Sequence, residues 1–287
     1  MTQNSHTKHV LWLTVATICI STSGALGKFI DLPTPVLIWW RAALATIFLF
    51  VFCKYRNLSF KIYNHKDRKT FVLASIFMAA HWITYFYALK LSNVAIGMLT
   101  IFTFPVITAV LEPFFSKVSF DKVHILLGVL VLTGIYILAP EFDLQSSQLQ
   151  GVLFGLLSAL CYALRNLLLK YRGDAYNGSV LMFYQVLLIS VLLSPVLFVL
   201  DSSNIQSQYP YVIILGLLTT AIGHTLFIRS LKYFKASTAS IIGSSQPIFG
   251  IIIAYFFLNE IPTTHTFLGG SLILLTIVIE SIRSNKS

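Results

Sequence analysis

The stretch VLMFYQVLLISVLLSPVLFVL, residues 180–200, contains no charged residue and has about the length that a helix needs to cross a bilayer. Its apolar residues do not alternate with polar ones, so it does not fit a strand of a membrane barrel. A segment that spans lipid must satisfy its backbone hydrogen bonds internally, as a helix does. We therefore predict that this stretch is a transmembrane helix.

Similar apolar segments occur along the whole chain. Of the 287 residues, 56% are hydrophobic and only 10% are charged, whereas a soluble domain carries about 25% charged residues. The pattern predicts an all-α integral membrane protein with ten transmembrane helices and no separate soluble domain. The approximate bounds of the segments are 10–30, 35–53, 70–89, 93–115, 123–139, 151–170, 180–200, 211–231, 236–258 and 264–281.

The connections between these segments differ in charge. Those on the side of the N-terminus hold most of the Lys and Arg residues, and the connection 54–69 is strongly basic. The opposite connections hold acidic residues such as Asp31 and Asp201, with Lys90 as the one clear basic exception. The positive-inside rule therefore predicts a multi-pass protein of the cell inner membrane with cytoplasmic N- and C-termini. This bias accounts for most of the net charge of +10, so no nucleic-acid-binding face is expected.

The two halves of the sequence match at a constant offset of 142 residues. Lys28 matches Lys170, and Lys90 matches Lys232. Matches between Leu and Ile residues are common by chance in apolar helices. Matches of Lys, Pro, Gly and paired Phe residues at a single offset indicate an internal repeat of a five-segment unit.

Each predicted unit, 1–142 or 143–287, holds an odd number of segments. The second unit must therefore lie upside down relative to the first, and the charges agree, because Lys90 falls outside and Lys232 inside. We predict two inverted five-helix repeats. Inverted repeats of this kind let a secondary transporter open a midplane site first to one side of the membrane and then to the other.

Two matched stretches carry a family resemblance: Tyr87-Ala88-Leu89-Lys90 followed by Pro105 and Glu112, and Ser230-Leu231-Lys232 followed by Pro247 and Asn259-Glu260. Together with ten segments in two repeats, they resemble the EamA branch of the drug/metabolite transporter superfamily. The resemblance covers nearly the whole chain. It implies exporters of amino acids and related small metabolites, a central cavity between the repeats and a peripheral last helix in each. The glutamate that usually ends the fourth helix is retained as Glu260, but Ser116-Lys117 stands there in the first repeat.

Segment 10–30 carries polar and small residues on one helical face: Thr14, Thr17, Ser21, Gly24 and Lys28. Polar groups in lipid usually face a bundle interior or a water-filled path. This face is therefore either a wall of the substrate path or a small-residue seam for close helix packing. Lys28 favours a wall, because a packing seam does not need a cation, although a lysine can also reach the membrane interface.

Charged and titratable residues within the segments supply further candidates. Arg41, and Arg165 with its neighbour Asn166, can each bind a substrate carboxylate, or else pair within the protein or reach the interface. His81 and His224 can exchange a proton near neutral pH, or else serve as neutral, hydrogen-bonded core residues.

Two matched prolines, Pro105 and Pro247, lie in the fourth segment of each half. A proline leaves a carbonyl free one turn earlier, and such a carbonyl can line a cavity. The two prolines are therefore hinge candidates, or else they only kink their helices. Polar residues precede both of them, Thr103 in the first half and Ser244 and Gln246 in the second.

Aromatic residues cluster around these polar positions, and Tyr85 is the candidate among them. Ligand cavities are mostly apolar and contain few polar groups, which fits such a mixture. The candidate substrate-binding residues are Ser21, Lys28, Arg41, His81, Tyr85, Thr103, Arg165, Asn166, His224, Ser244 and Gln246.

These features predict a secondary transporter, and specifically an exporter, of small zwitterionic or anionic metabolites such as amino acids. The expected partners are this small-molecule substrate and the lipid bilayer, without nucleic acid, and the protein is expected to be a monomer or homodimer. We expect no enzyme activity, cofactor or metal, because the sequence has neither metal-ligand spacing nor a midspan cluster of acids and nucleophiles. The alternatives are a channel or sensor without carrier activity and, less favoured, a membrane-embedded enzyme.

Overall fold

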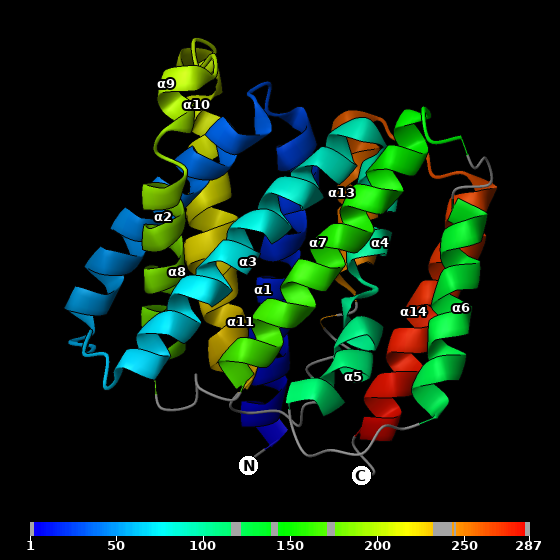
Figure 1. Ribbon diagram of the computed structural model, residues 1–287, viewed down its shortest axis with the longest axis horizontal. Coiled ribbons are helices and arrows are strands. Elements are labelled where there is room, and N and C mark those ends of the chain that lie inside the picture. The colour runs from blue at the N-terminus through cyan, green and yellow to red at the C-terminus, as the bar shows by residue number, and fades with distance from the viewer. Residues whose placement is uncertain are drawn as a thin grey trace.

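The computed structural model describes residues 3–115, 122–138, 143–170, 176–231, 243 and 245–284, and these residues form helices and connections without β-strands (Figure 1). The first half contains α1 (Gln3–Phe29), α2 (Thr34–Tyr55), α3 (His65–Leu91), α4 (Val94–Ile101), α5 (Phe104–Phe115) and α6 (Val123–Leu138). The second half contains α7 (Ser147–Lys170), α8 (Gly178–Leu192), α9 (Val196–Val199), α10 (Ile205–Ile214), the π-helix η1 (Leu215–Gly223), α11 (His224–Leu231), α13 (Gln246–Leu258) and α14 (Thr264–Ser284).

Asparagine side chains set several helix ends. Asn64, Asn93 and Asn177 precede α3, α4 and α8, and each side chain accepts a hydrogen bond from a backbone N–H in the first turn at 2.8–2.9 Å. The first N–H groups of a helix have no partner within the helix, so such caps stabilise its start. Asn259 ends α13 in the left-handed conformation, with φ at 56°.

All ten predicted apolar segments are helical through most of their described length, as expected from their composition. Two segments are interrupted, between α4 and α5 and between α8 and α9. In the described residues, six helical segments have the length and hydropathy to cross a membrane, namely 34–55, 65–91, 94–115, 147–170, 178–199 and 205–227, and shorter apolar helices occur at 123–138, 246–258 and 264–279. The predicted total of ten membrane crossings stays a prediction.

Large apolar side chains lie on the outside of the bundle. Leu132 in α6 and Phe256 in α13 are 65% and 78% exposed, whereas Arg41 and Trp82 are almost fully buried. A soluble protein rarely exposes so many contiguous apolar residues, but lipid accepts them. The exposed residues therefore mark a membrane-facing surface around a core that contains a charged side chain.

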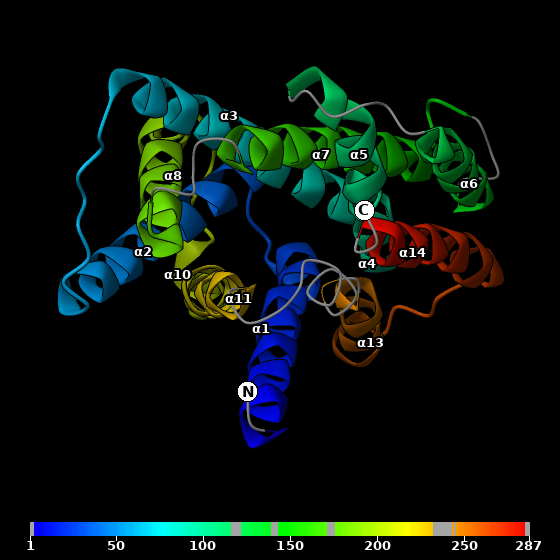
Figure 2. The same cartoon turned by 90° about the horizontal axis from the view of Figure 1, so that it is seen from below.

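The helices are arranged so that α3 and α7 pack side by side along one face, and α1 packs against α13 and η1 on the other (Figure 2). Helices α6 and α14 pack together at one edge. They approach closely at two glycines, because a Cβ atom added to Gly134 would lie 2.9 Å from the carbonyl oxygen of Gly269. The last helix of each half thus lies at the periphery, as the family resemblance implies.

Both chain termini lie at the same end of the bundle, together with the α2–α3 connection (Figure 1). We call this the terminal end and the opposite one the distal end. Basic residues of the α2–α3 connection and of the first turn of α3 are exposed at the terminal end, namely Arg56, Lys61, Lys66, Arg68 and Lys69. At the distal end, Asp31 and Asp201 are exposed in the connections that follow α1 and α9.

Candidate functional site

A central cavity of about 440 Å³ lies between helices of both halves. Its wall includes Arg165 and Asn166 in the last two turns of α7, and α7 ends toward the terminal end (Figure 1). The cavity therefore extends from the middle of the bundle toward the terminal end. Eight residues singled out from the sequence line it, namely Arg41, His81, Tyr85, Pro105, Arg165, Asn166, His224 and Gln246.

Four other predicted residues lie away from this cavity. Ser21 is fully buried and donates to the carbonyl oxygen of Thr17 at 2.8 Å, and Thr103 is buried and donates to that of Thr100 at 2.8 Å. Pro247 is buried near the start of α13. Lys28 lies in an ion pair at the distal end.

The remaining candidate, Ser244, lies outside the described residues. The helix 10–30 face approaches α4 closely at Gly24, as a packing seam would. A Cβ atom added to Gly24 would lie 3.0 Å from Val94 and 3.1 Å from Met98 of α4.

Arg41 is the most deeply buried charged side chain of the cavity wall, with 2% of its surface exposed. Its Nε donates to the hydroxyl of Thr220 at 2.8 Å, Nη1 donates to that of Ser23 at 3.3 Å, and Nη2 donates to that of Thr219 at 3.3 Å. Its guanidinium also lies over the ring of Trp82, 4.2 Å from the ring centroid. Neutral groups of α1, α3 and η1 thus hold this cation in place.

Arg165 is held differently. Its Nε donates to Oε1 of Gln185 at 2.8 Å, and its Nη1 donates to Oδ1 of Asn166 at 2.8 Å. Gln185 is itself fixed, because its amide donates to the carbonyl oxygen of Leu181 at 3.1 Å. These bonds use Nε and one N–H of Nη1, so Nη2 has no hydrogen-bond partner among the described residues, and Arg165 lines the cavity. Sequence reasoning missed Gln185, although an amide within the uncharged segment 180–200 is a signal that could have found it.

His81 makes a buried hydrogen-bond pair with α7. Its Nδ1 lies 2.8 Å from the hydroxyl of Ser158, and this hydroxyl donates to the carbonyl oxygen of His81 at 2.9 Å. A hydroxyl has one proton to donate, so the geometry is satisfied when Nδ1–H donates to Ser158. The ring stacks on Tyr162 with centroids 4.6 Å apart. His81 is therefore a hydrogen-bonded residue that also lines the cavity.

Aromatic rings form much of the remaining wall. Phe104 lies edge-on to Tyr162 at 4.8 Å, and Phe102 packs against Phe104 at 5.9 Å. Tyr85 and Trp82, both nearly buried, come from α3. A wall of aromatic rings with a few fixed polar groups is typical of a site for a small organic molecule. Neither the cavity wall nor the rest of the described chain contains a group of three His, Cys, Asp or Glu residues that could hold a metal ion.

Both predicted hinge prolines lie at helix starts. The fourth apolar segment breaks between α4 and α5, and Pro105 is the second residue of α5. Pro247 is likewise the second residue of α13. A proline is well tolerated at such positions because the first N–H groups of a helix have no partner within the helix. The break beside Pro105 places Phe102, Phe104 and Pro105 in the cavity wall.

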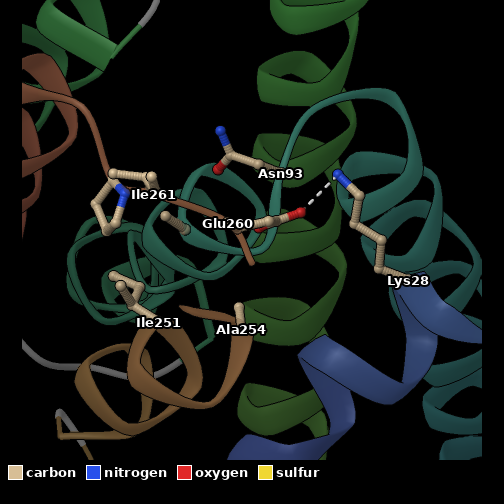
Figure 3. Close-up of a pocket in the computed structure, with 8 residues that line it drawn as sticks. Lys28, Asn93, Ile251, Ala254, Glu260 and Ile261 are labelled. Atoms are coloured by element: carbon tan, nitrogen blue, oxygen red, sulfur yellow. Dashed lines mark ion pairs between the residues drawn. The ribbon is translucent and has the colours of Figure 1, made fainter. Parts of the chain in front are cut away.

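A second, smaller cavity of about 320 Å³ lies at the distal end. Figure 3 shows Glu260 pointing toward Lys28 there, with Asn93 close by. The Lys28 Nζ atom lies 2.8 Å from Oε1 of Glu260 and donates to the carbonyl oxygen of Ser92 at 2.5 Å. Oε2 of Glu260 accepts a hydrogen bond from the N–H of Val94 at 2.8 Å. This ion pair joins α1, the start of α4 and the residues that follow α13.

The family model described as the EamA-like transporter family matches the chain twice, over residues 7–139 and 149–282. The uncharacterized transporter YxxF of Bacillus subtilis is 23% identical over 96% of this chain and 89% of its own length. An uncharacterized transporter of Archaeoglobus fulgidus is 28% identical over 68% of this chain and 70% of its own. An S-adenosylmethionine uptake transporter of Rickettsia felis is 29% identical over 41% of this chain and 40% of its own. A solved crystal structure with 15% identity covers 98% of both chains with a TM-score of 0.69, which indicates a shared fold.

Proposed function

The chain belongs to the EamA-like transporter family, and on that premise we propose that it exports small carboxylate-bearing metabolites, such as amino acids, by alternating access. It is a multi-pass membrane protein whose relatives are named as transporters. Export is the direction that the family resemblance implies. The observation that carries the substrate class is Arg165, a guanidinium that lines the central cavity with its Nη2 atom available.

Arg165 suits a carboxylate because its guanidinium is charged and the N–H groups of Nη2 can donate charge-assisted hydrogen bonds to carboxylate oxygens. Gln185 and Asn166 fix the orientation of this guanidinium with two hydrogen bonds of 2.8 Å, so little side-chain freedom is lost when a substrate binds. The ring of Tyr162 lies 5.8 Å from the guanidinium, and Phe104 packs on Tyr162, so both rings would contact an apolar or aromatic substrate body.

Alternating access is supported by the two matches to the family model, which cover the two predicted repeat units separately. It is also supported by the cavity, whose wall draws on both halves and extends toward the terminal end. We propose that the terminal end is cytoplasmic, because the exposed basic residues of the α2–α3 connection lie there.

The substrate class is tested by ligand-induced stabilisation. The purified protein is heated in detergent with a panel of amino acids, other small carboxylates, nucleosides and vitamins, since a ligand that binds the folded state raises the unfolding midpoint. We expect a carboxylate to stabilise the wild type and Arg165→Gln to lose at least roughly thirtyfold in affinity for it. Arg68→Gln, the same change at an exposed position of α3, is the matched control.

The hits are then used in proteoliposomes. Saturable uptake that is stimulated by substrate on the opposite side supports a carrier, whereas uptake without saturation or counterflow would support a channel. Equal affinity of Arg165→Gln and the wild type for every carboxylate hit would contradict the proposed site. The direction is tested by efflux from cells that are loaded with a hit.

The inverted topology is tested with two single cysteines. Ser59 in the α2–α3 connection and Ser203 before α10 are both exposed, and they lie in connections matched by the 142-residue offset. In a background without Cys19, Cys53 and Cys161, a membrane-impermeant maleimide on intact cells should label Ser203→Cys and not Ser59→Cys. Labelling of both residues from the same side would rule out the inverted repeat.

A further inference from the structure

The guanidinium of Arg41 is a buried positive charge in the wall of the central cavity. The described residues that hold its guanidinium are hydroxyls and aromatic rings, and none is a carboxylate. The ion pairs found in the described part of the chain are Lys28–Glu260 and Lys170–Glu112. Arg41 therefore brings a positive charge to the cavity wall that its described contacts do not neutralise.

Burying a charge without a counter-ion is costly, so such residues in membrane proteins usually serve the substrate path. Arg41 is poorly placed to clasp a substrate directly, since it is 2% exposed and Nε, Nη1 and Nη2 each already donate to a hydroxyl. Its field nevertheless reaches the cavity, because a low-dielectric surrounding screens a charge weakly. Arg165 contacts the substrate, and Arg41 sets the potential in which the substrate sits.

We propose that Arg41 determines which substrate charge the cavity accepts, favouring organic anions and excluding organic cations of the same shape. This inference rests on the proposed function, because it needs a substrate in the central cavity. Clefts lined by one sign of charge raise the local concentration of the opposite ion roughly tenfold to a thousandfold. The effect is therefore measured by comparing the affinities of the protein for an anion and for a cation of similar shape.

The test compares three probes that share a phenyl group and differ in charge: 3-phenylpropionate, L-phenylalanine and 2-phenylethylamine. Their affinities for the purified protein are measured by thermal stabilisation. We expect the wild type to bind the anion at least about tenfold more tightly than the amine. Arg41→Met should reduce the anion preference severalfold, with the remainder due to Arg165, whereas Arg41→Lys, which keeps the charge, should retain the full preference.

An unchanged anion preference in Arg41→Met, or its loss in Arg41→Lys, would overturn the role of Arg41 while leaving the proposed function intact. Tighter binding of the amine than of the anion by the wild type would overturn it as well. If the wild type binds none of the three probes and no carboxylate of the larger panel, the proposed function itself fails and this inference fails with it. Arg41→Lys keeps the test decisive if Arg41→Met does not fold.

A second observation is a pair of ion pairs related by the repeat. Lys28 and Lys170 are matched by the 142-residue offset, and each pairs with a glutamate of the other half. Lys28, in the last turn of α1, pairs with Glu260, two residues after α13, and Lys170, in the last turn of α7, pairs with Glu112 in the last turn of α5. Because α1 ends at the distal end whereas α7 and α5 end toward the terminal end (Figure 1), the first pair lies at the distal end and the second at the terminal end.

Each pair connects the first apolar segment of one half to the fourth apolar segment of the other half. One pair lies at each end of the bundle. We infer that each pair helps to hold its own end of the cavity closed, and that each must break before its end opens. This inference rests on the proposed alternating access and is independent of substrate charge. The distal pair is the stronger closure, because its lysine and glutamate side chains are 26% and 19% exposed, against 60% and 25% at the terminal end.

The test uses a single cysteine in the cavity wall, Ile20→Cys, in the cysteine-free background. Its labelling by an impermeant maleimide is measured on intact cells and on inverted vesicles. Glu260→Gln should raise labelling from the distal side about twofold to fivefold, as expected when a partly exposed ion pair is lost. Glu112→Gln should raise labelling from the terminal side instead.

A charge-swapped variant, Lys28→Glu with Glu260→Lys, guards against a general loss of structure. It restores the ion pair but not the hydrogen bonds to Ser92 and Val94, so we expect labelling between that of the wild type and that of Glu260→Gln. Equal increases on both sides in Glu260→Gln, or no increase on either, would overturn the closure. Because labelling needs no substrate, this result is separate from the ligand screen.

Discussion

Helix α3 and the run α10–η1–α11 occupy matched positions in the two halves, but they differ in helical geometry. Helix α3 is α-helical from His65 to Leu91, whereas the matched run contains the π-helix Leu215–Gly223. A π-helix forms i→i+5 hydrogen bonds and turns less per residue than an α-helix, and it often occurs at functional sites. Side chains beyond it therefore point in directions that the repeat alone does not predict.

The two cavity histidines show this displacement. At the 142-residue offset, the position that matches His81 is Gly223, yet His224 lines the cavity. Gly223 packs against α1 instead, where an added Cβ atom would lie 2.9 Å from Cγ1 of Ile20. The π-helix accounts for the one-residue difference between the two histidines.

Arg41 lies between the regular helix and the distorted one. On the side of α3 its guanidinium stacks on Trp82 and lies 5.6 Å from the ring centroid of Phe86. On the side of η1 it donates to Thr219 and Thr220. Adjacent residues of an α-helix point about 100° apart, so the smaller rotation in the π-helix helps both hydroxyls to reach one side chain. Helix α3 thus supplies packing to the Arg41 guanidinium, and η1 supplies hydrogen bonds to the same cation.

The largest expected loss of stability comes from removing the α3 side chain that packs on Arg41. Trp82→Ala removes a 2%-exposed ring that covers Arg41, and large-to-small changes of this kind cost about 3–5 kcal/mol. We expect a clear drop in the thermal unfolding midpoint in detergent. Trp12→Ala, at a position of α1 that is 44% exposed, is the control and should change the midpoint little. Similar drops for the two variants would mean that the packing of Trp82 on Arg41 is unimportant.

The hydrogen bonds that η1 makes to Arg41 are tested with two threonine-to-valine substitutions. Thr220→Val removes a 2.8 Å acceptor of the Arg41 guanidinium and should cost about 1.5–3 kcal/mol, the range for a hydrogen bond to a charged group. Thr219→Val removes a 3.3 Å acceptor and should cost less. Thr46→Val is the matched control, because the hydroxyl of Thr46 bonds only to its own helix, at Ala42. A larger loss for Thr219→Val than for Thr220→Val would contradict the geometry.

Much of the fold and part of the site could be predicted from the sequence. The apolar segments became helices because lipid leaves the backbone no other partners. Arg41, Arg165, His81 and His224 were predicted because charged and titratable groups in lipid turn inward, and all four line the cavity. Ser21 was assigned to the site on the same grounds, but a hydroxyl can bond to a carbonyl of its own helix and needs no cavity.

Other features have no local signal in the sequence. The segment LGLLTTAIG, residues 215–223, is as apolar and as evenly patterned as its α-helical neighbours, so nothing in it predicts a π-helix. Lys28 was assigned to the substrate path, whereas its partner Glu260 is more than two hundred residues away in the chain. Both the π-helix and the Lys28–Glu260 pair depend on how the two halves pack together. The residue spacing within a single segment does not determine that packing.

The smallest expected loss of stability concerns a hydrogen bond that distinguishes His81 from His224. Ser158 of α7 holds His81, but the position matched to Ser158 in the first half is Ala16, which offers no hydroxyl. Ser158→Ala should therefore make the first histidine site resemble the second, at a cost of about 1 kcal/mol in stability. A double-mutant cycle with His81→Phe should give a coupling of similar size. The same cycle with Ser190→Ala, whose hydroxyl bonds to its own helix at Leu187, should give none. Additive effects of Ser158→Ala and His81→Phe would show that the hydrogen bond does not hold the ring, and the contrast between the two histidines would then rest on the π-helix alone.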